Sequence, residues 1–103
     1  MGGDIVLTLA EHLADHVGSK PPRTRTIEGI EFHRIARRFS LPSYWIAERD
    51  GIQAFVTPRL HGNTFIVTVG GETLSSLVRT ETRALERAAK DLLRRCSVAA
   101  EAT

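Results

Sequence analysis

A chain of 103 residues with 42% hydrophobic and 25% charged residues has the length and composition of a single globular domain. Its one cysteine, Cys96, excludes an intramolecular disulfide and a zinc site built from cysteines. The formal net charge of +2 is too small to indicate nucleic-acid binding by itself, and no apolar run approaches the roughly 20 residues of a membrane span. The N-terminus carries no export signal, so we expect a cytoplasmic protein without a membrane partner.

The N-terminal segment is predicted to form a helix that begins at Asp4 as N-cap and ends near Val17, before Gly18. Apolar residues recur at every fourth position of this segment, as on the buried face of a helix. His12 and His16 share one face of this helix at the spacing of half a metal site. Because no motif supplies further ligands, we interpret them as a solvated edge and expect no metal or other cofactor.

The next part of the chain divides into a linker and an ambiguous stretch. Residues 18–26 contain Pro21 and Pro22 and are predicted to form a connector, whose arginines also suit a basic arm along a phosphate backbone. Residues 29–39 are predicted to form a short helix, with extended structure as the alternative. The helical interpretation rests on the i, i+3, i+4, i+7 spacing of Phe32, Ile35, Ala36 and Phe39.

An antiparallel meander is predicted for the middle of the chain. Asp50-Gly51 between two β-rich runs is the strongest local hairpin signal, and the stretch from Pro58 to Asn63 is rich in turn-forming residues. Residues 74–78 should add an extended segment at the sheet edge. The three strands themselves are expected at 44–49, 52–57 and 64–69. The expected fold is therefore α+β, with a small antiparallel β-sheet of 3–4 strands packed against N-terminal and C-terminal helices in one domain, 1–103.

The C-terminal helix is predicted to have Thr80 as its N-cap and to end near Arg95, with residues 1–3 and 97–103 frayed. Its apolar sector consists of Leu85, Ala88, Leu92 and Cys96. We expect both terminal helices to cover the same face of the sheet. The common core would then contain Leu9, Leu13, Phe55, Phe65, Val67, Leu85 and Leu92.

Basic residues on the last helix form the clearest charge pattern. They lie opposite the apolar sector, spaced four, three and four residues apart, at Arg83, Arg87, Lys90 and Arg94. This stripe has two interpretations, a solvated helix face or a ridge that contacts phosphates. Further candidate contacts to nucleic acid or another partner are Arg34, Arg37, Arg38, Arg59 and His61.

The stretch from Ile35 to Ile46, Ile-Ala-Arg-Arg-Phe-Ser-Leu-Pro-Ser-Tyr-Trp-Ile, resembles a helix-turn-helix. In this resemblance Ala36 is the small residue of the first helix, and Ser40 stands at the usual turn glycine. Ile46 is the apolar residue of the second helix. The resemblance implies that the second helix enters the major groove and that the hairpin 52–69 forms a wing.

The predicted order of helix, three strands and helix is similar to that of the double-stranded RNA-binding domain. The run from Phe65 to Gly71 resembles the middle strand and turn of that family, and Arg79 to Lys90 resembles the start of its second helix. This resemblance implies recognition of A-form RNA through phosphate and 2′-hydroxyl contacts. At the positions of the family's lysine cluster this chain carries Glu81, Thr82 and Leu85.

No phosphate-cradling glycine loop, serine elbow or paired metal motif occurs, so we expect no catalytic residues and no enzymatic activity. The first functional hypothesis is a small nucleic-acid-binding or regulatory protein that acts on DNA or RNA. The alternative is an inhibitor or adaptor of the phage or plasmid accessory type, for example a counter-defence protein. Such a protein would bind its target through an exposed strand edge or through the aromatic pair Tyr44 and Trp45. Either function is compatible with a homodimer.

Overall fold

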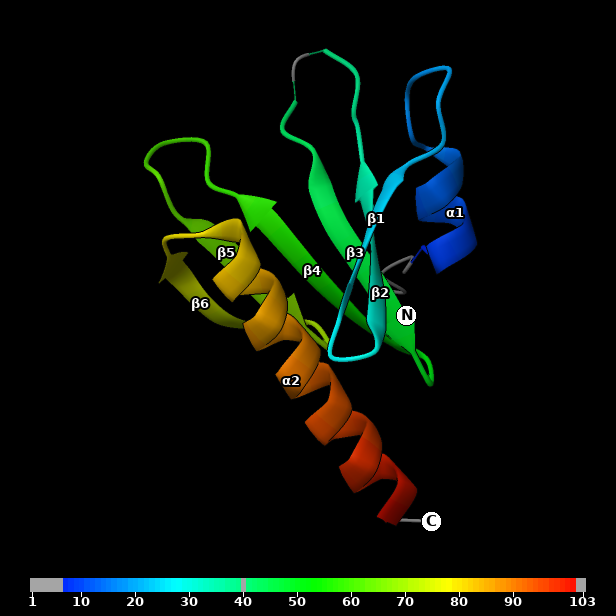
Figure 1. The fold of residues 1–103 in the computed structure, drawn as a ribbon, viewed down its shortest axis with the longest axis vertical. Helices are drawn as coiled ribbons and strands as arrows, with labels where there is room; N and C mark the ends of the chain where they lie inside the picture. The colour runs from blue at the N-terminus through cyan, green and yellow to red at the C-terminus, as the bar shows by residue number, and fades with distance from the viewer. Residues whose placement is uncertain (1–6, 40, 102–103) are drawn as a thin grey trace, which may run out of the picture.

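The computed structural model of the chain describes residues 7–39 and 41–101. A short helix precedes six strands, each of which pairs antiparallel with the next along the chain, and a long helix follows (Figure 1). The predicted α+β class is confirmed, but the sheet has six strands instead of three or four. The elements are α1 (Leu9–Ala14), β1 (Arg23–Ile27), β2 (Ile30–Ile35), β3 (Tyr44–Arg49), β4 (Ile52–Pro58), β5 (Phe65–Val69), β6 (Glu72–Val78) and α2 (Glu81–Glu101).

Three tight turns join the strands at one end of the sheet, at Glu28-Gly29, Asp50-Gly51 and Gly70-Gly71. Both residues of each pair have positive φ, between 52° and 81°. Two successive residues of positive φ define the type I′ turn, whose twist matches that of the flanking strands. The Asp50-Gly51 hairpin is confirmed, and we call this side of the molecule the turn end. The connections at the opposite side are longer, and we call it the loop end.

The first half of the sheet corrects two predictions. Residues 29–39 do not form a helix, because β2 occupies 30–35 and is extended, and the 18–26 linker contains the start of β1. Phe32 and Ile35 lie on opposite faces of β2, and each is 0% exposed. A strand that is buried on both faces loses its alternating pattern, and here the apolar residues fell by chance at helical spacing.

The second half of the sheet agrees with the predicted meander, since strands at 44–49, 52–58 and 65–69 are present and 72–78 adds the edge strand. The pairing of β5 with β6 is irregular between Phe65 and Thr68. Next to this irregularity the backbone N–H of Leu77 donates a hydrogen bond to Oγ of Ser75 at 3.2 Å. Such a bulge satisfies an edge group locally and makes the edge a poorer template for another strand.

The two helices cover opposite faces of the sheet, not one face as predicted. Helix α2 packs on β4 and β5 and also touches both edge strands, β1 and β6, so the sheet curves around it (Figure 1). The buried cluster on this side includes Val67, Leu85 and Leu92 together with Trp45. Ile35 and Ile46 are buried on the other face, where α1 contacts β2 and β3. Of the predicted core, Val67, Leu85 and Leu92 are fully buried and Phe65 packs against them, whereas Leu9, Leu13 and Phe55 are only partly buried and lie outside this cluster.

Both helices begin at capping residues. Thr8 forms a capping box with Glu11 at the start of α1, while the predicted cap, Asp4, lies outside the described residues. The Thr80 hydroxyl accepts a hydrogen bond from the Arg83 backbone N–H at 3.2 Å, as predicted for the N-cap of α2. The prediction that this helix ends near residue 95 is wrong, because it continues to Glu101.

Candidate functional site

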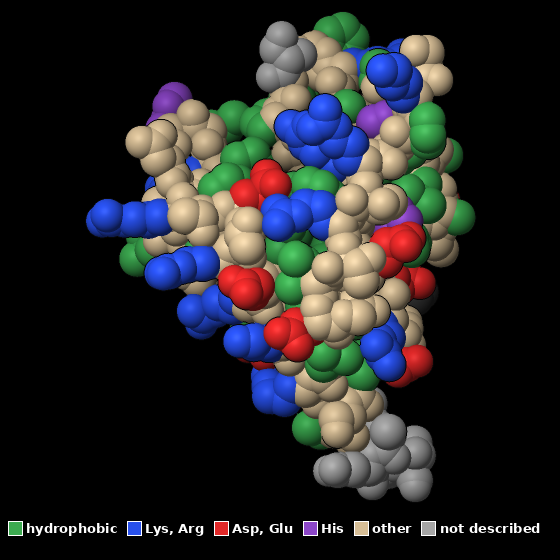
Figure 2. All heavy atoms as spheres, viewed as in Figure 1, with side chains coloured by type: hydrophobic (Ala, Val, Ile, Leu, Met, Phe, Trp, Pro, Cys, Tyr) green, Lys and Arg blue, Asp and Glu red, His purple; other side chains and the backbone are tan. Residues whose placement is uncertain are grey.

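A row of basic side chains along α2 is the most regular charged feature of the surface (Figure 2). Arg83, Arg87, Lys90 and Arg94 are all exposed, and we call these four residues the α2 ridge. The buried residues of the same helix, Leu85, Ala88, Leu92 and Cys96, occupy the opposite sector, as predicted. Each helical residue rises about 1.5 Å along the axis, so the ridge is about 16 Å long.

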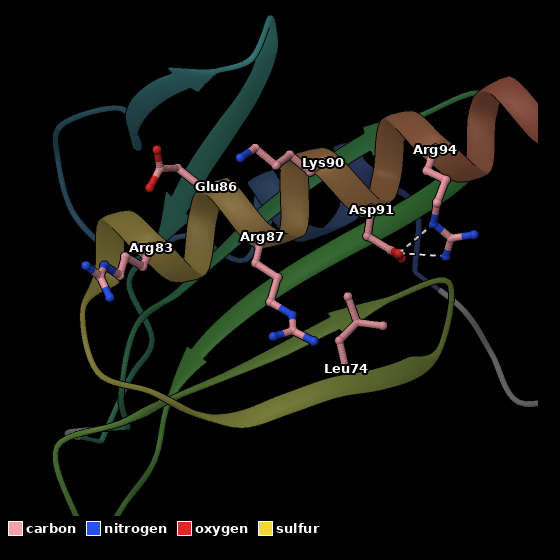
Figure 3. A pocket seen from close by; sticks show the side chains of 7 residues that line it. All are labelled: Leu74, Arg83, Glu86, Arg87, Lys90, Asp91 and Arg94. Carbon is pink, nitrogen blue, oxygen red and sulfur yellow. Dashed lines mark hydrogen bonds and ion pairs between the residues drawn. The ribbon is translucent and has the colours of Figure 1, made fainter.

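Beside the ridge, α2 and the edge strand β6 enclose two shallow hollows. One has a volume of about 520 Å³ and is lined by the ridge residues together with Glu86, Asp91 and Leu74 (Figure 3). The other, of about 460 Å³, is lined by Arg79, Arg83 and Arg87 with residues of β6. In Figure 3 the side chain of Arg87 extends from α2 toward Leu74 of β6. Arg79 precedes the helix and was not among the predicted contacts.

The ridge is not uniformly available to a ligand. Arg94 donates two hydrogen bonds to Oδ1 of Asp91, at 2.7 and 3.2 Å, and Arg95 donates one to Oδ2 at 2.6 Å. Partial burial pushes the pKa of Asp91 up, but the hydrogen bonds from Arg95 and Arg94 outweigh it and hold the pKa below its usual value. Arg95 also pairs with Glu72 at the start of β6. Among the described residues, Arg83, Arg87 and Lys90 take part in no ion pair, so they carry the net positive charge of the ridge.

The second predicted group of basic residues lies at the loop end. Arg34 donates to Oγ of Ser43 at 3.0 Å, and Arg37 donates to the Pro42 carbonyl at 2.8 Å. These two guanidinium groups therefore fix the connection between β2 and β3. Arg38 in the same connection, and Arg59 and His61 between β4 and β5, are exposed. The meander brings this second group to one end of the molecule, away from the middle of the α2 ridge (Figure 1).

The predicted aromatic interface is not present as such. Trp45 is 5% exposed and packs in the cluster beneath α2, so it offers no surface to a partner. Tyr44 is half-buried, with its hydroxyl 2.7 Å from Nδ1 of His12 and the Arg37 guanidinium 5.3 Å from its ring centre. The two residues alternate along β3 and point to opposite faces, which the dipeptide alone does not reveal.

His12 and His16 have separate structural partners. His12 lies against Tyr44 and Phe55 on the sheet, and burial lowers its pKa. Nδ1 of His16 accepts a hydrogen bond from the Ala36 backbone N–H at 3.0 Å, so Nε2, 3.1 Å from the Lys20 carbonyl, is the nitrogen that donates. The interpretation of these histidines as a solvated helix edge is therefore wrong. Among residues 7–39 and 41–101, no group of three or more His, Cys, Asp or Glu side chains is placed to hold a metal ion.

Two further features bear on the sequence predictions. Residues 44–49, which supply the second helix in the helix-turn-helix resemblance, form strand β3, while Ser40 lies outside the described residues. Burial raises the pKa of the Cys96 thiol, which faces the Arg49 carbonyl at 3.5 Å.

Within the described part of the chain, neither helix has the length and hydropathy to cross a bilayer. No protein-family model, curated protein or solved structure matches this chain.

Proposed function

We propose that this protein is a non-enzymatic nucleic-acid-binding module that contacts the phosphate backbone through the α2 ridge. The observation that carries the proposal is the alignment of Arg83, Arg87 and Lys90, exposed on one helix without ion-pair partners among the described residues. Aligned cations that replace the counterions of a phosphate chain supply most of the sequence-independent affinity of nucleic-acid-binding proteins. The ridge length of about 16 Å corresponds to about five steps of 3.4 Å along one strand of a duplex.

The surroundings of the ridge support a backbone contact more than a reading of base sequence. Its hollows are shallow and open, and they are lined mainly by charged side chains, with no asparagine or glutamine side chain of the kind that pairs with base edges. Arg79 extends the positive charge toward the loop end. The resemblance to the double-stranded RNA-binding domain remains a prediction, so RNA and DNA duplexes both belong in the first experiment.

The test is the salt dependence of binding, measured by fluorescence anisotropy with labelled duplex DNA, duplex RNA and single strands. The logarithm of affinity should fall linearly with the logarithm of salt concentration, by about 0.9 per phosphate on duplex DNA and about 0.7 on a single strand. The double variant Arg83→Gln/Arg87→Gln should flatten this slope by up to about two and weaken all sequences alike. Its folding should be nearly unchanged, because both side chains are exposed and take part in no ion pair among the described residues.

Two matched variants separate a ridge contact from a general effect of charge. Arg94→Gln removes the same charge as Arg87→Gln but should change the slope less, because Asp91 already neutralises Arg94. Glu86→Gln, in the same hollow, should tighten binding because it removes a negative charge beside the phosphates. Absence of binding near 50 mM salt would show that the ridge is only a solvated helix face. Equal effects of Arg94→Gln and Arg87→Gln would show a general effect of charge instead of a contact at Arg87.

A protein partner is the second candidate function, and one observation favours it. The outer sides of β1 and β6 form the two edges of the sheet, and an extended peptide can add a strand at such an edge. Strand β1 pairs with β2 in regular register over its whole length, whereas β6 is irregular, so β1 is the better template. A proline at Thr24 or Thr26 that abolished capture of a cellular partner, with nucleic-acid binding absent, would select this function.

A further inference from the structure

Exposed apolar side chains gather at the loop end of the molecule. Outside this end the only large exposed hydrophobic residue among those described is Val98 in α2. The others are Phe39 and Leu41 between β2 and β3, Leu60 between β4 and β5, Leu77 near the end of β6, and Val17 after α1. Phe39 is 90% exposed and Leu60 is 76% exposed. Exposed apolar side chains that are grouped at one end of a domain, instead of being scattered singly over its surface, are typical of an interaction site.

Basic residues stand directly beside the two most exposed tips. Phe39 follows Arg37 and Arg38, and Leu60 lies between Arg59 and His61. Figure 1 shows that the connections before β1, between β2 and β3, and between β4 and β5 all project at the same end, and Figure 2 shows basic side chains there. The type I′ turns at the opposite end instead carry Glu28 and Asp50. The meander therefore gives the domain one end that is both apolar and cationic.

The connections that hold these tips are ordered by hydrogen bonds. Phe39 has a φ of 61°, a left-handed conformation that a bulky residue rarely adopts, and the Leu41 N–H donates to the Arg38 carbonyl across it. The Arg37 guanidinium holds the Pro42 carbonyl on the same connection. In the second connection the Arg59 N–H donates to the Thr64 carbonyl at 3.0 Å. Phe39 and Leu60 are thus presented outward by closed turns.

We propose that the loop end docks on an anionic lipid bilayer, with Phe39 and Leu60 inserted among the headgroups and with Arg38 and Arg59 against the lipid phosphates. Peripheral binding of this kind combines buried apolar area with attraction to anionic lipid, and it needs no membrane-spanning segment. It departs from the sequence-based expectation of no membrane partner. It also goes beyond the proposed nucleic-acid function and does not depend on it, because it uses a different surface.

The shapes at this end favour a fluid partner over a nucleic acid or a rigid protein. The tips project from separate connections. Neither Phe39 nor Leu60 lines the hollows of about 400 and 190 Å³ nearby, although Arg38 and Val17 line the larger one. A bilayer can accept separate tips without a shaped cavity, whereas a protein hot spot sits in a packed pocket. Leucine also lacks the aromatic face on which a base stacks.

The proposal is tested by sedimentation of the full chain with phosphatidylcholine vesicles that contain or lack phosphatidylserine. Binding should require phosphatidylserine and weaken as salt is added. Phe39→Ser/Leu60→Ser should lower the partition coefficient about tenfold or more, whereas Val98→Ser, a change of an exposed apolar residue far from this end, should leave it unchanged. Arg38→Gln and Arg59→Gln should each lower it about fivefold.

The outcomes discriminate this proposal from the others. The proposal is overturned if the protein fails to sediment with phosphatidylserine vesicles at low salt. It is also overturned if Phe39→Ser/Leu60→Ser binds the vesicles as tightly as wild type, since charge alone would then attract the protein. If the wild type does not bind vesicles and this double variant loses nucleic-acid binding, Phe39 would be assigned to base stacking instead. Arg83→Gln/Arg87→Gln should retain vesicle binding, so failure of the nucleic-acid proposal leaves this test intact. Unchanged urea midpoints will show that the variants fold, as expected for exposed positions.

Discussion

The separation of the interior into two apolar layers makes a quantitative prediction about Leu85 and Ile46. Both side chains are 0% exposed, but Leu85 belongs to the layer beneath α2 and Ile46 to the face on the α1 side. Leu85→Ala should lower the free energy of unfolding by about 2–5 kcal/mol, through lost burial and the cavity that remains. Ile46→Val removes one methylene group and should lower it by about 0.5–1.5 kcal/mol.

The coupling between the two changes is the decisive quantity. Because the sheet backbone lies between the two side chains, the double variant should lose the sum of the single losses to within about 0.5 kcal/mol. The matched pair Leu85→Ala/Val67→Ala, within one layer, should deviate from additivity by about 0.5–3 kcal/mol. Urea unfolding at fixed pH with a common m value measures all five variants. A coupling above about 1 kcal/mol between Leu85 and Ile46, or a loss under about 0.5 kcal/mol for Leu85→Ala, would refute the two-layer arrangement.

Three further predictions concern ionisable groups. His16→Ala leaves the Ala36 N–H without its acceptor, so it should lower the free energy of unfolding by about 1–3 kcal/mol in a urea titration. A loss near zero would mean that water replaces the imidazole as the acceptor. Burial lowers the pKa of His12 below 6.5, so the contribution of the neutral imidazole to stability should be complete above that pH and lost as the pH falls through the folded-state pKa. The variant His12→Phe should therefore lose less stability than wild type between pH 7.5 and about 5. An NMR titration that gives His12 a pKa at or above 6.5 would contradict this prediction. The lowered pKa of Asp91 has the same sign, since its contribution is present above the unfolded carboxyl pKa of about 3.9 and disappears as the pH falls through the lower folded value. Acid unfolding of Asp91→Asn should accordingly lack this component, and identical acid profiles for the variant and wild type would count against it.

The sequence predicted those parts of the fold that local signals encode. Asp50-Gly51 located the β3–β4 hairpin, and Thr80 as N-cap located the start of α2. Glu28-Gly29 forms the same kind of turn, but the helical spacing of Phe32 and Ile35 concealed it. The alternating pattern of a strand is missing because both faces of β2 are buried, a consequence of two helices on opposite sides that no local pattern reports. A search for every residue–glycine pair between β-tolerant runs would have found this turn.

The candidate surfaces also differ in how far the sequence predicts them. The α2 ridge was predictable because one helix carries all of it, and a spacing of three or four residues fixes a common face. The loop end was predicted only in part. Arg38 and Arg59 were among the candidate contacts, but the predicted helix at 29–39 concealed that Phe39 lies on a connection between two strands. Trp45 was misassigned because its burial depends on α2, which begins 36 positions later in the chain.

The contrast between the two ends also governs which length changes the chain can accept. An added or deleted residue at Asp50-Gly51 would shift the register and turn the following side chains to the wrong face of the sheet. In the connection between β4 and β5, which already spans six residues, each doubling of length costs only about 0.6 kcal/mol in closure entropy. Short peptide epitopes or sensor sequences are therefore best grafted into this connection, where they would be displayed on a scaffold whose register is set at its far end.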